Sequence, residues 1–87
     1  MIDKIKSRLG IAQAIEIYDN DIQMYIEDCK QDMIASGVDE ALANSEREDV
    51  LTAVTLYVNA YWGSDRTDTE KYLDLYQRKV FRLTLEE

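Results

Sequence analysis

The stretch VLTAVTLYVNAYWG, from Val50 to Gly63, constrains the fold of this chain more than any other segment. Its length and the glycine at its end favour a helix over a strand. At about 100° per residue, its polar residues Thr52, Thr55 and Asn59 fall in one narrow strip, and apolar side chains occupy the remaining surface. Such a helix needs cover from more than one direction, either from its own chain or from a partner.

Other helices are the expected source of that cover. The 87-residue chain has no proline and three glycines, and strong helix formers dominate it. Its length suits one domain with a modest core. We therefore predict an all-α fold: a single domain over residues 1–87, built as a compact bundle of about four helices with short connections and no sheet. The helices are expected near residues 2–9, 20–36, 46–62 and 68–83, with a small turn or helix near 39–44.

Capping signals mark the expected helix ends. A serine or threonine followed three residues later by glutamate matches the capping box, and glycine is typical just beyond a helix C terminus. The N-terminal signals are Ser45-x-x-Glu48, Thr67-x-x-Glu70 and the looser Asn20-x-x-Gln23, and the C-terminal signals are Gly37 and Gly63.

Apolar stripes mark the sides of two helices that should face the core. In the helix near 20–36 the stripe comprises Ile22, Ile26, Cys29 and Met33, with Tyr25 alongside. In the helix near 68–83 it comprises Tyr72, Leu73, Tyr76, Val80 and Leu83, and Leu75 and Phe81 widen it.

The charge is strongly negative and unevenly distributed. The net charge of -8 disfavours non-specific binding to DNA or RNA, because the phosphate backbone would repel the chain. Residues 1–15 carry +2, residues 16–49 hold eleven acids against two bases for -9, and residues 50–87 come to -1. No apolar run approaches the roughly 20 residues of a membrane span, and MIDKIKSRLG lacks the apolar region of a signal peptide. The lone cysteine fits synthesis in a reducing, cytoplasmic compartment.

The residues that usually carry catalysis or bind metals are missing or have a simpler explanation. Histidine is absent, and Cys29 on an apolar stripe is expected to be packed rather than nucleophilic. The DND run at Asp19–Asp21 lacks the glycine and distal glutamate of a calcium loop, so a capping role is favoured. Paired carboxylates are expected in so acidic a chain, and no glycine-rich phosphate loop is present. We predict no enzyme activity, no cofactor and no metal.

Aromatic residues cluster around the end of the apolar helix. Tyr57, Tyr61 and Trp62 lie within two turns, and Tyr72 and Tyr76 lie on the next helix. Core packing explains some of them, but tyrosine and tryptophan are also enriched at protein interfaces. We expect a mixture, with one side of the helix in the core and another against a partner, and some self-association.

Three runs carry a resemblance to a known family: YDNDIQMYIEDCKQDMIASGV, VLTAVTLYVNAYWG and KYLDLYQRKVFRL. From IKSRLGI to FRLTLEE the chain resembles the small head–tail connector proteins of long-tailed bacteriophages, also called head-completion or DNA-packaging adaptor proteins. The resemblance implies a helical protomer that assembles into a ring, commonly of about twelve copies. Such a ring docks beneath the portal protein, extends the DNA channel and presents a platform for the tail or a stopper protein. It also implies a place at the portal vertex of the virion, after synthesis in the cytoplasm of the host bacterium, and no catalytic residues.

A ring joins unlike patches of neighbouring copies, and the uneven charge could set their register. The candidate interface residues are Tyr57, Tyr61, Trp62, Arg66, Arg78, Lys79 and Arg82. Acidic residues facing the channel would let DNA pass without sticking. A second class stays open, namely a small acidic helical adaptor or inhibitor of a single protein partner, with a DNA mimic as one subtype.

Overall fold

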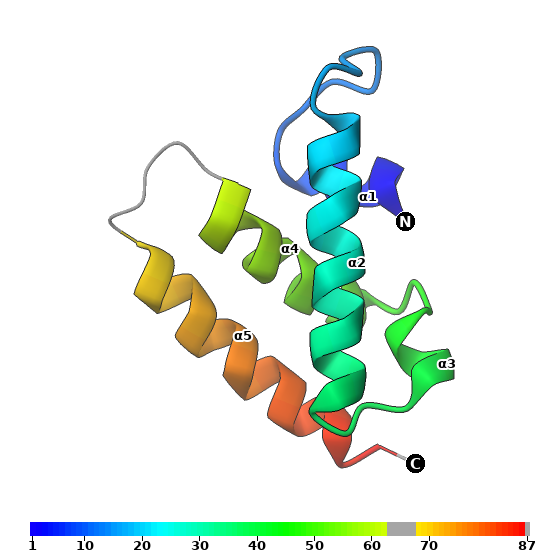
Figure 1. The fold of residues 1–87 in the computed structure, drawn as a ribbon, viewed down its shortest axis with the longest axis vertical. Coiled ribbons are helices and arrows are strands. Elements are labelled where there is room, and N and C mark those ends of the chain that lie inside the picture. The colour runs from blue at the N-terminus through cyan, green and yellow to red at the C-terminus, as the bar shows by residue number, and fades with distance from the viewer. Residues whose placement is uncertain (63–67, 87) are drawn as a thin grey trace.

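The computed structural model describes residues 1–62 and 68–86. Within this part the chain forms five helices: α1 (Ile2–Arg8), α2 (Asp19–Ala35), α3 (Glu40–Ala43), α4 (Glu48–Trp62) and α5 (Thr69–Thr84) (Figure 1). The described residues contain no strand. The all-α prediction is confirmed, and each of the four main helices begins and ends within two residues of its expected bounds.

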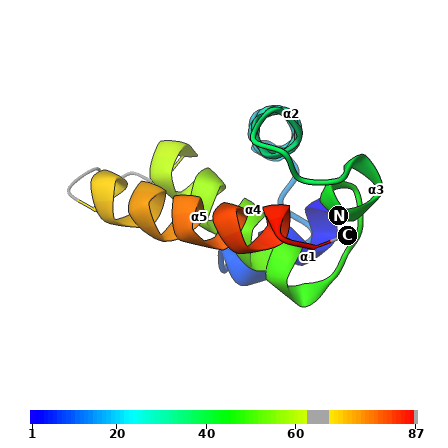
Figure 2. The same cartoon turned by 90° about the horizontal axis from the view of Figure 1, so that it is seen from below.

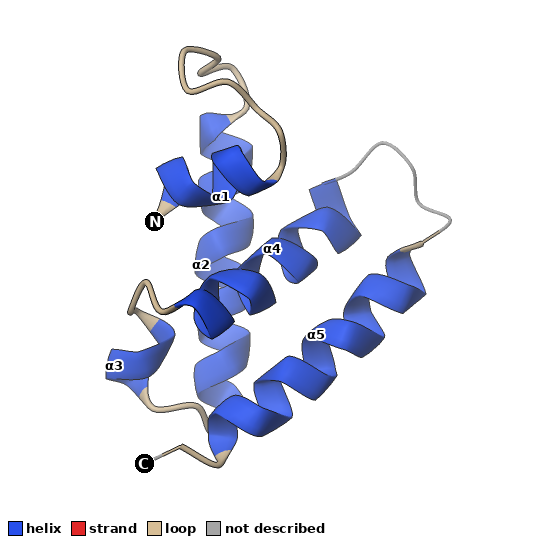
Figure 3. Cartoon of the chain, turned by 180° about the vertical axis from the view of Figure 1, so that it is seen from behind, coloured by secondary structure: helices blue, strands red, loops and turns tan. Residues whose placement is uncertain are grey.

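The helix α4 lies at the centre of the arrangement. It runs beside α5 in the opposite direction, and α2 crosses over this pair on one face (Figures 1 and 2). The short helix α1 packs against both α2 and α4, in front of α2 when the molecule is seen from behind (Figure 3). Three helices of the same chain therefore surround α4.

This arrangement explains why α4 is apolar on nearly every side. Ala53, Val54 and Val58 are completely buried, and Tyr61 is the one apolar residue of α4 that is exposed, at 40%. On the polar strip, the hydroxyl of Thr55 donates to the carbonyl of Leu51 at 2.7 Å. The chain itself supplies most of the cover that α4 requires, and only its last turn leaves an apolar side chain open to a partner.

The predicted core stripe of α2 is confirmed. Its four members, Ile22, Ile26, Cys29 and Met33, are completely buried. Burying one large aliphatic side chain stabilises a fold by about 1.5–3 kcal/mol, so this stripe is a major part of the core.

The stripe of α5 is confirmed in its central part. Tyr76, Val80 and Leu83 are buried against the rest of the protomer. Phe81 and Leu75, which widen the stripe in the sequence, are 65% and 38% exposed. These two side chains therefore belong to the surface and not to the core.

Glycine ends two of the helices in the way that the residue type favours. Gly37 follows α2 with a φ of +107°, where a side chain would be strained. The N–H of Gly37 donates to Ile34 and that of Val38 donates to Met33, at 3.0 and 2.9 Å, which is the Schellman motif. The predicted end at Gly37 is confirmed. Gly10, with a φ of +78°, ends α1 in the same way and was missed in the sequence.

The structure differs from the prediction at the N termini of α4 and α2. The hydroxyl of Ser45 donates to the carbonyl of Leu42 at 2.7 Å and accepts from the N–H of Arg47 at 3.5 Å, which lies just before α4 and not in its first turn. The first helical bond of α4 runs from the N–H of Leu51 to the carbonyl of Arg47 instead. The prediction of a cap at Ser45 is therefore wrong.

The start of α2 also differs from the prediction. The helix begins one residue before Asn20, and the residue that precedes it, Tyr18, makes no side-chain cap bond. A side-chain cap is found at α3, where Asp39 accepts from the N–H of Leu42 at 3.3 Å. The predicted ends at Gly63 and Thr67 lie outside the described residues.

Candidate assembly surfaces

Lys6, on α1, is buried and holds the loop between α1 and α2 in place. Its side chain is 2% exposed, and its ammonium donates to the carbonyls of Gln13 and Ile15 at 3.1 and 2.7 Å. The third partner is the carboxylate of Asp19, 2.8 Å away. A lysine ammonium has three donors and is costly to bury without partners, so these three acceptors satisfy it. The loop of residues 11–18 is thereby fixed against both α1 and α2.

This loop displays apolar side chains on the surface. Ile17 is 78% exposed and Ile15 is 43% exposed. Tyr18, at 39%, is partly covered because its ring meets that of Trp62 edge-on, with the centroids 5.3 Å apart. We call Ile15, Ile17 and Tyr18 the loop patch. Several exposed apolar side chains in one short segment are a feature of interaction sites.

Four tyrosines from three helices form a row along the seam between α2 and the α4–α5 pair. Tyr25 stacks on Tyr61 at 6.2 Å, Tyr61 contacts Tyr57 at 4.8 Å, and Tyr57 meets Tyr76 edge-on at 5.2 Å. Such ring pairs contribute about 0.5–1.5 kcal/mol each beyond the area they bury. The row therefore ties α2, α4 and α5 together.

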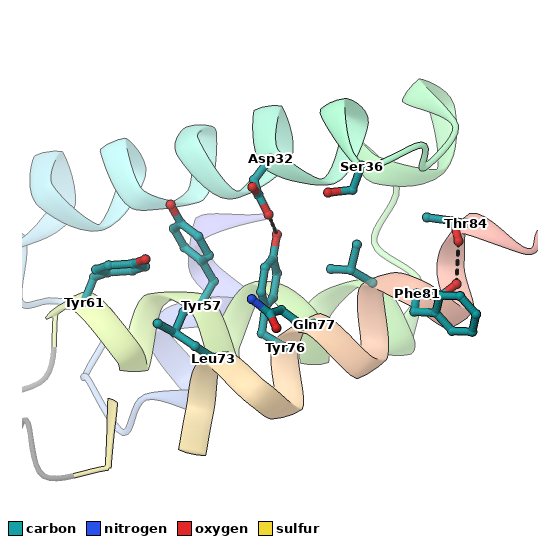
Figure 4. A pocket seen from close by; sticks show the side chains of 10 residues that line it. Asp32, Ser36, Tyr57, Tyr61, Leu73, Tyr76, Gln77, Phe81 and Thr84 are labelled. Carbon is teal, nitrogen blue, oxygen red and sulfur yellow. Dashed lines mark hydrogen bonds between the residues drawn. The ribbon is translucent and has the colours of Figure 1, made fainter. Parts of the chain in front are cut away.

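A groove of about 470 Å³ opens beside this row (Figure 4). Asp32 and Ser36 of α2 lie on one side, and Tyr57, Tyr61, Tyr76 and Phe81 of α4 and α5 lie on the other. Desolvation raises the pKa of Tyr57, which lines the groove, to about 12. The groove therefore combines aromatic surface with a single carboxylate.

Tyr76 links the groove to the core through two hydrogen bonds. Its hydroxyl donates to the carboxylate of Asp32 at 2.6 Å and accepts from the thiol of Cys29 at 3.7 Å. Burial, more than any other cause, raises the pKa of the Tyr76 hydroxyl, and burial also raises the pKa of Cys29 to about 12. Because a thiol with so high a pKa stays protonated near neutral pH, the prediction that Cys29 is packed and unreactive agrees with its geometry.

The outer side of α5 forms a second exposed apolar surface. It carries Leu75, Phe81 and Leu85, of which Phe81 and Leu85 are 65% and 68% exposed. Cations accompany them at Arg78, Lys79 and Arg82. We call these six residues the α5 outer face.

Arg8 and Arg47 are both engaged with acids of the same chain. Arg8 pairs with Glu48, and Arg47 pairs with Asp49 at 2.6 Å and with Glu86 at 3.1 Å. The hydrogen bond from Arg47 lowers the pKa of Asp49. Because Lys6 is also buried against Asp19, two of the three basic side chains of residues 1–15 form ion pairs within the protomer. These pairs leave Lys4 as the base of this segment without an ion pair in the described residues.

The described residues hold no group of three or more side chains placed to bind a metal ion. None of the helices in this part of the chain is long and apolar enough to cross a membrane.

Comparison with known families decides the identity. The model of a family described as phage connector protein matches residues 1–87, the full length of the sequence. The chain belongs to this family. Membership supports a role for the connector between phage head and tail, where it meets head and tail proteins as a component of the virion. Neither the curated proteins nor the solved structures include a significant match to the connector.

The candidate interface residues do not form one surface on this connector. Tyr57 and Tyr61 line the tyrosine groove, whereas Trp62 is half-buried against Tyr18 and the core. The basic residues Arg78, Lys79 and Arg82 lie together on α5. Arg66 lies outside the described residues.

Sequence reasoning missed the loop patch altogether. The signal was present as IEIY, where two isoleucines alternate with an acid in a segment that has no helical period. It gained meaning only when the structure showed that Lys6 holds this segment with both isoleucines exposed.

Proposed function

We propose that this connector is a structural component that assembles as a ring beneath the portal protein. The ring extends the channel through which DNA leaves the head and provides the platform on which the tail or a stopper protein docks. It has no catalytic role, and it occupies the portal vertex of the virion after synthesis in the host cytoplasm. The family match over the whole chain carries this proposal.

The protomer has the properties that such an assembly requires. Its core is complete within one chain, so a copy can fold before it meets its neighbours. Its surface carries two separate apolar patches, the loop patch and the α5 outer face. A ring uses unlike patches on each copy, whereas a symmetric dimer needs only one patch that matches itself.

The charge of the chain suits a channel for DNA. Because each copy has a net charge of -8, a ring would repel the phosphate backbone of DNA and would not retain the DNA as it passes. Recognition of DNA sequence plays no part in this function.

The test is a measurement of particle mass and shape, first on the purified connector and then on its mixture with portal protein. We expect rings in electron micrographs, of about twelve copies, either alone at high concentration or on the portal. A particle that stays at one or two copies under both conditions would contradict the proposal and favour a small adaptor of one protein partner.

A further inference from the structure

We propose that neighbouring connectors are joined by the loop patch of one copy bound to the α5 outer face of the next. This inference rests on the proposed function, because it names the contact that builds the ring. Of the exposed large apolar side chains in residues 1–62 and 68–86, three lie in the loop patch and three on the α5 outer face; the other two are Met24 and Tyr61. In a ring, one neighbour of each copy would cover its loop patch and the other neighbour would cover its α5 outer face.

The charges beside the two surfaces are complementary. Near the loop patch, Asp19 forms an ion pair with Lys6. The exposed carboxylates of Glu16 and Asp21 make no ion pair within the described part of the chain. On the α5 outer face, Arg78 pairs with Asp74 at 3.1 Å. The two other cations of that face, Lys79 and Arg82, have no such partner among residues 1–62 and 68–86. Glu16 and Asp21 of one copy can therefore meet Lys79 and Arg82 of the next across the contact between the two copies, which we call the joint. Such complementary charges favour one register and one partner.

The α5 outer face also has the shape to receive a side chain from the loop. Leu75 and Leu56 lie in a hollow of about 390 Å³ between α4 and α5, and Arg78, Lys79 and Arg82 border it. A second hollow, of about 530 Å³, contains Phe81 and Leu85 on the other side of the Arg78–Arg82 ridge. An apolar anchor in a pocket rimmed by polar groups is the common form of an interface centre. Ile17, the most exposed large apolar side chain among the described residues, is the anchor we assign.

The positions of the two surfaces suit a head-to-tail contact. The loop lies at one end of the longest axis of the protomer, and the C-terminal half of α5 lies at the other (Figure 1). Contacts between unlike patches at opposite ends propagate from copy to copy and close as a ring when the rotation between copies permits. Lys6 holds the loop before the neighbour arrives, which reduces the ordering cost of binding.

Charge reversal tests the pairing. Glu16→Lys with Asp21→Lys reverses the loop side, and Lys79→Glu with Arg82→Glu reverses the α5 side. Each pair places like charges across the joint, so we expect the concentration at half-assembly to rise at least about tenfold. Combining all four substitutions restores opposite charges and should restore assembly at least in part.

A matched control separates this effect from net charge. Asp28→Lys with Glu40→Lys changes the net charge as the loop pair does, and it also removes one acid from the first turn of a helix. We expect it to assemble as the parent does. Circular dichroism and thermal melting of every variant establish that the protomer remains folded.

Disulfide trapping provides a second measurement. With Ile17→Cys and Phe81→Cys in one chain, mild oxidation should link copies into a ladder of covalent multimers. Phe81→Cys alone can give nothing larger than a dimer, because the native Cys29 is buried. A ladder from Ile17→Cys with Glu40→Cys that matches the first in yield would show random collision and would overturn the pairing.

The outcomes separate the inference from the function on which it rests. If the parent forms no assembly, alone or with portal, both the proposed function and the joint are wrong. If the parent assembles and both charge-reversed pairs assemble equally well, or if the fourfold variant stays folded and unassembled, only the joint is wrong.

Discussion

Replacing Lys6 by methionine should destabilise the protomer more than any change on its surface. Methionine preserves most of the apolar stem that packs in α1 but removes the ammonium. Two backbone carbonyls, of Gln13 and Ile15, and the carboxylate of Asp19 then lose their common donor. The loop would have to turn these groups towards water, at the expense of its packing on α1 and α2.

The size of the effect follows from the environment of each acceptor. Removing one partner of a fully buried charge pair costs about 3–5 kcal/mol, but Asp19 is 35% exposed and keeps part of its hydration. We therefore expect the free energy of unfolding to fall by about 3 kcal/mol. With about 2.1 cal/mol/K of unfolding entropy per residue, 87 residues give about 180 cal/mol/K, so the Tm should fall by about 16 °C.

Thermal and urea denaturation followed by circular dichroism measure this change. Lys4→Met is the matched control, because Lys4 lies on the same helix, is exposed, and makes no ion pair in the described residues; it should shift stability by less than about 0.5 kcal/mol. Asp19→Asn completes a double-mutant cycle, in which Lys6→Met and the double variant should differ little. Equal melting temperatures for Lys6→Met and Lys4→Met would refute the role of Lys6.

Three further changes test other parts of the protomer. Tyr76→Phe removes the hydroxyl that joins Asp32 to Cys29 and should lower the free energy of unfolding by about 1–2 kcal/mol; an unchanged urea midpoint would show that this bond adds nothing. Because the pKa of Cys29 is raised to about 12 in the folded protein, the unfolded chain loses this proton first. The contribution of Cys29 to stability should therefore be constant below about pH 8.5 and fall at higher pH, so the alkaline loss of stability should be less steep in Cys29→Ala. A parallel pH profile in that variant would contradict the assignment. Trp62→Ala removes a half-buried ring that meets Tyr18, so it should lower stability by about 2–3 kcal/mol, below the range for a fully buried tryptophan; a parent-like melt would place this ring outside the core.

Local periodicity made most of the fold predictable. The stripe from Ile22 to Met33 repeats at helical spacing, and that spacing alone places its members on one face of α2. Gly37 could be assigned in the same way, because the residue type and its position just past the stripe agree. The helix ends were less predictable where several polar residues compete, as at Ser45, whose hydroxyl binds the preceding helix instead.

The assembly surfaces depended on contacts that have no local pattern. Lys6 looks like one of three bases in the first ten residues, and its burial follows from a loop that returns its carbonyls to the ammonium. Phe81 matches the apolar period of α5 but lies on the flank that α4 and α2 leave uncovered. Tyr61 and Trp62, adjacent in the sequence, differ in exposure, and Trp62 meets Tyr18 and packs against the core.

Electron cryo-microscopy of the portal vertex in the intact virion tests the central claim most directly. The account predicts a closed ring of this chain beneath the portal, with the loop patch of each copy against the α5 outer face of its neighbour. Absence of the chain from that vertex, or its presence there as one or two copies without a ring, would contradict the account.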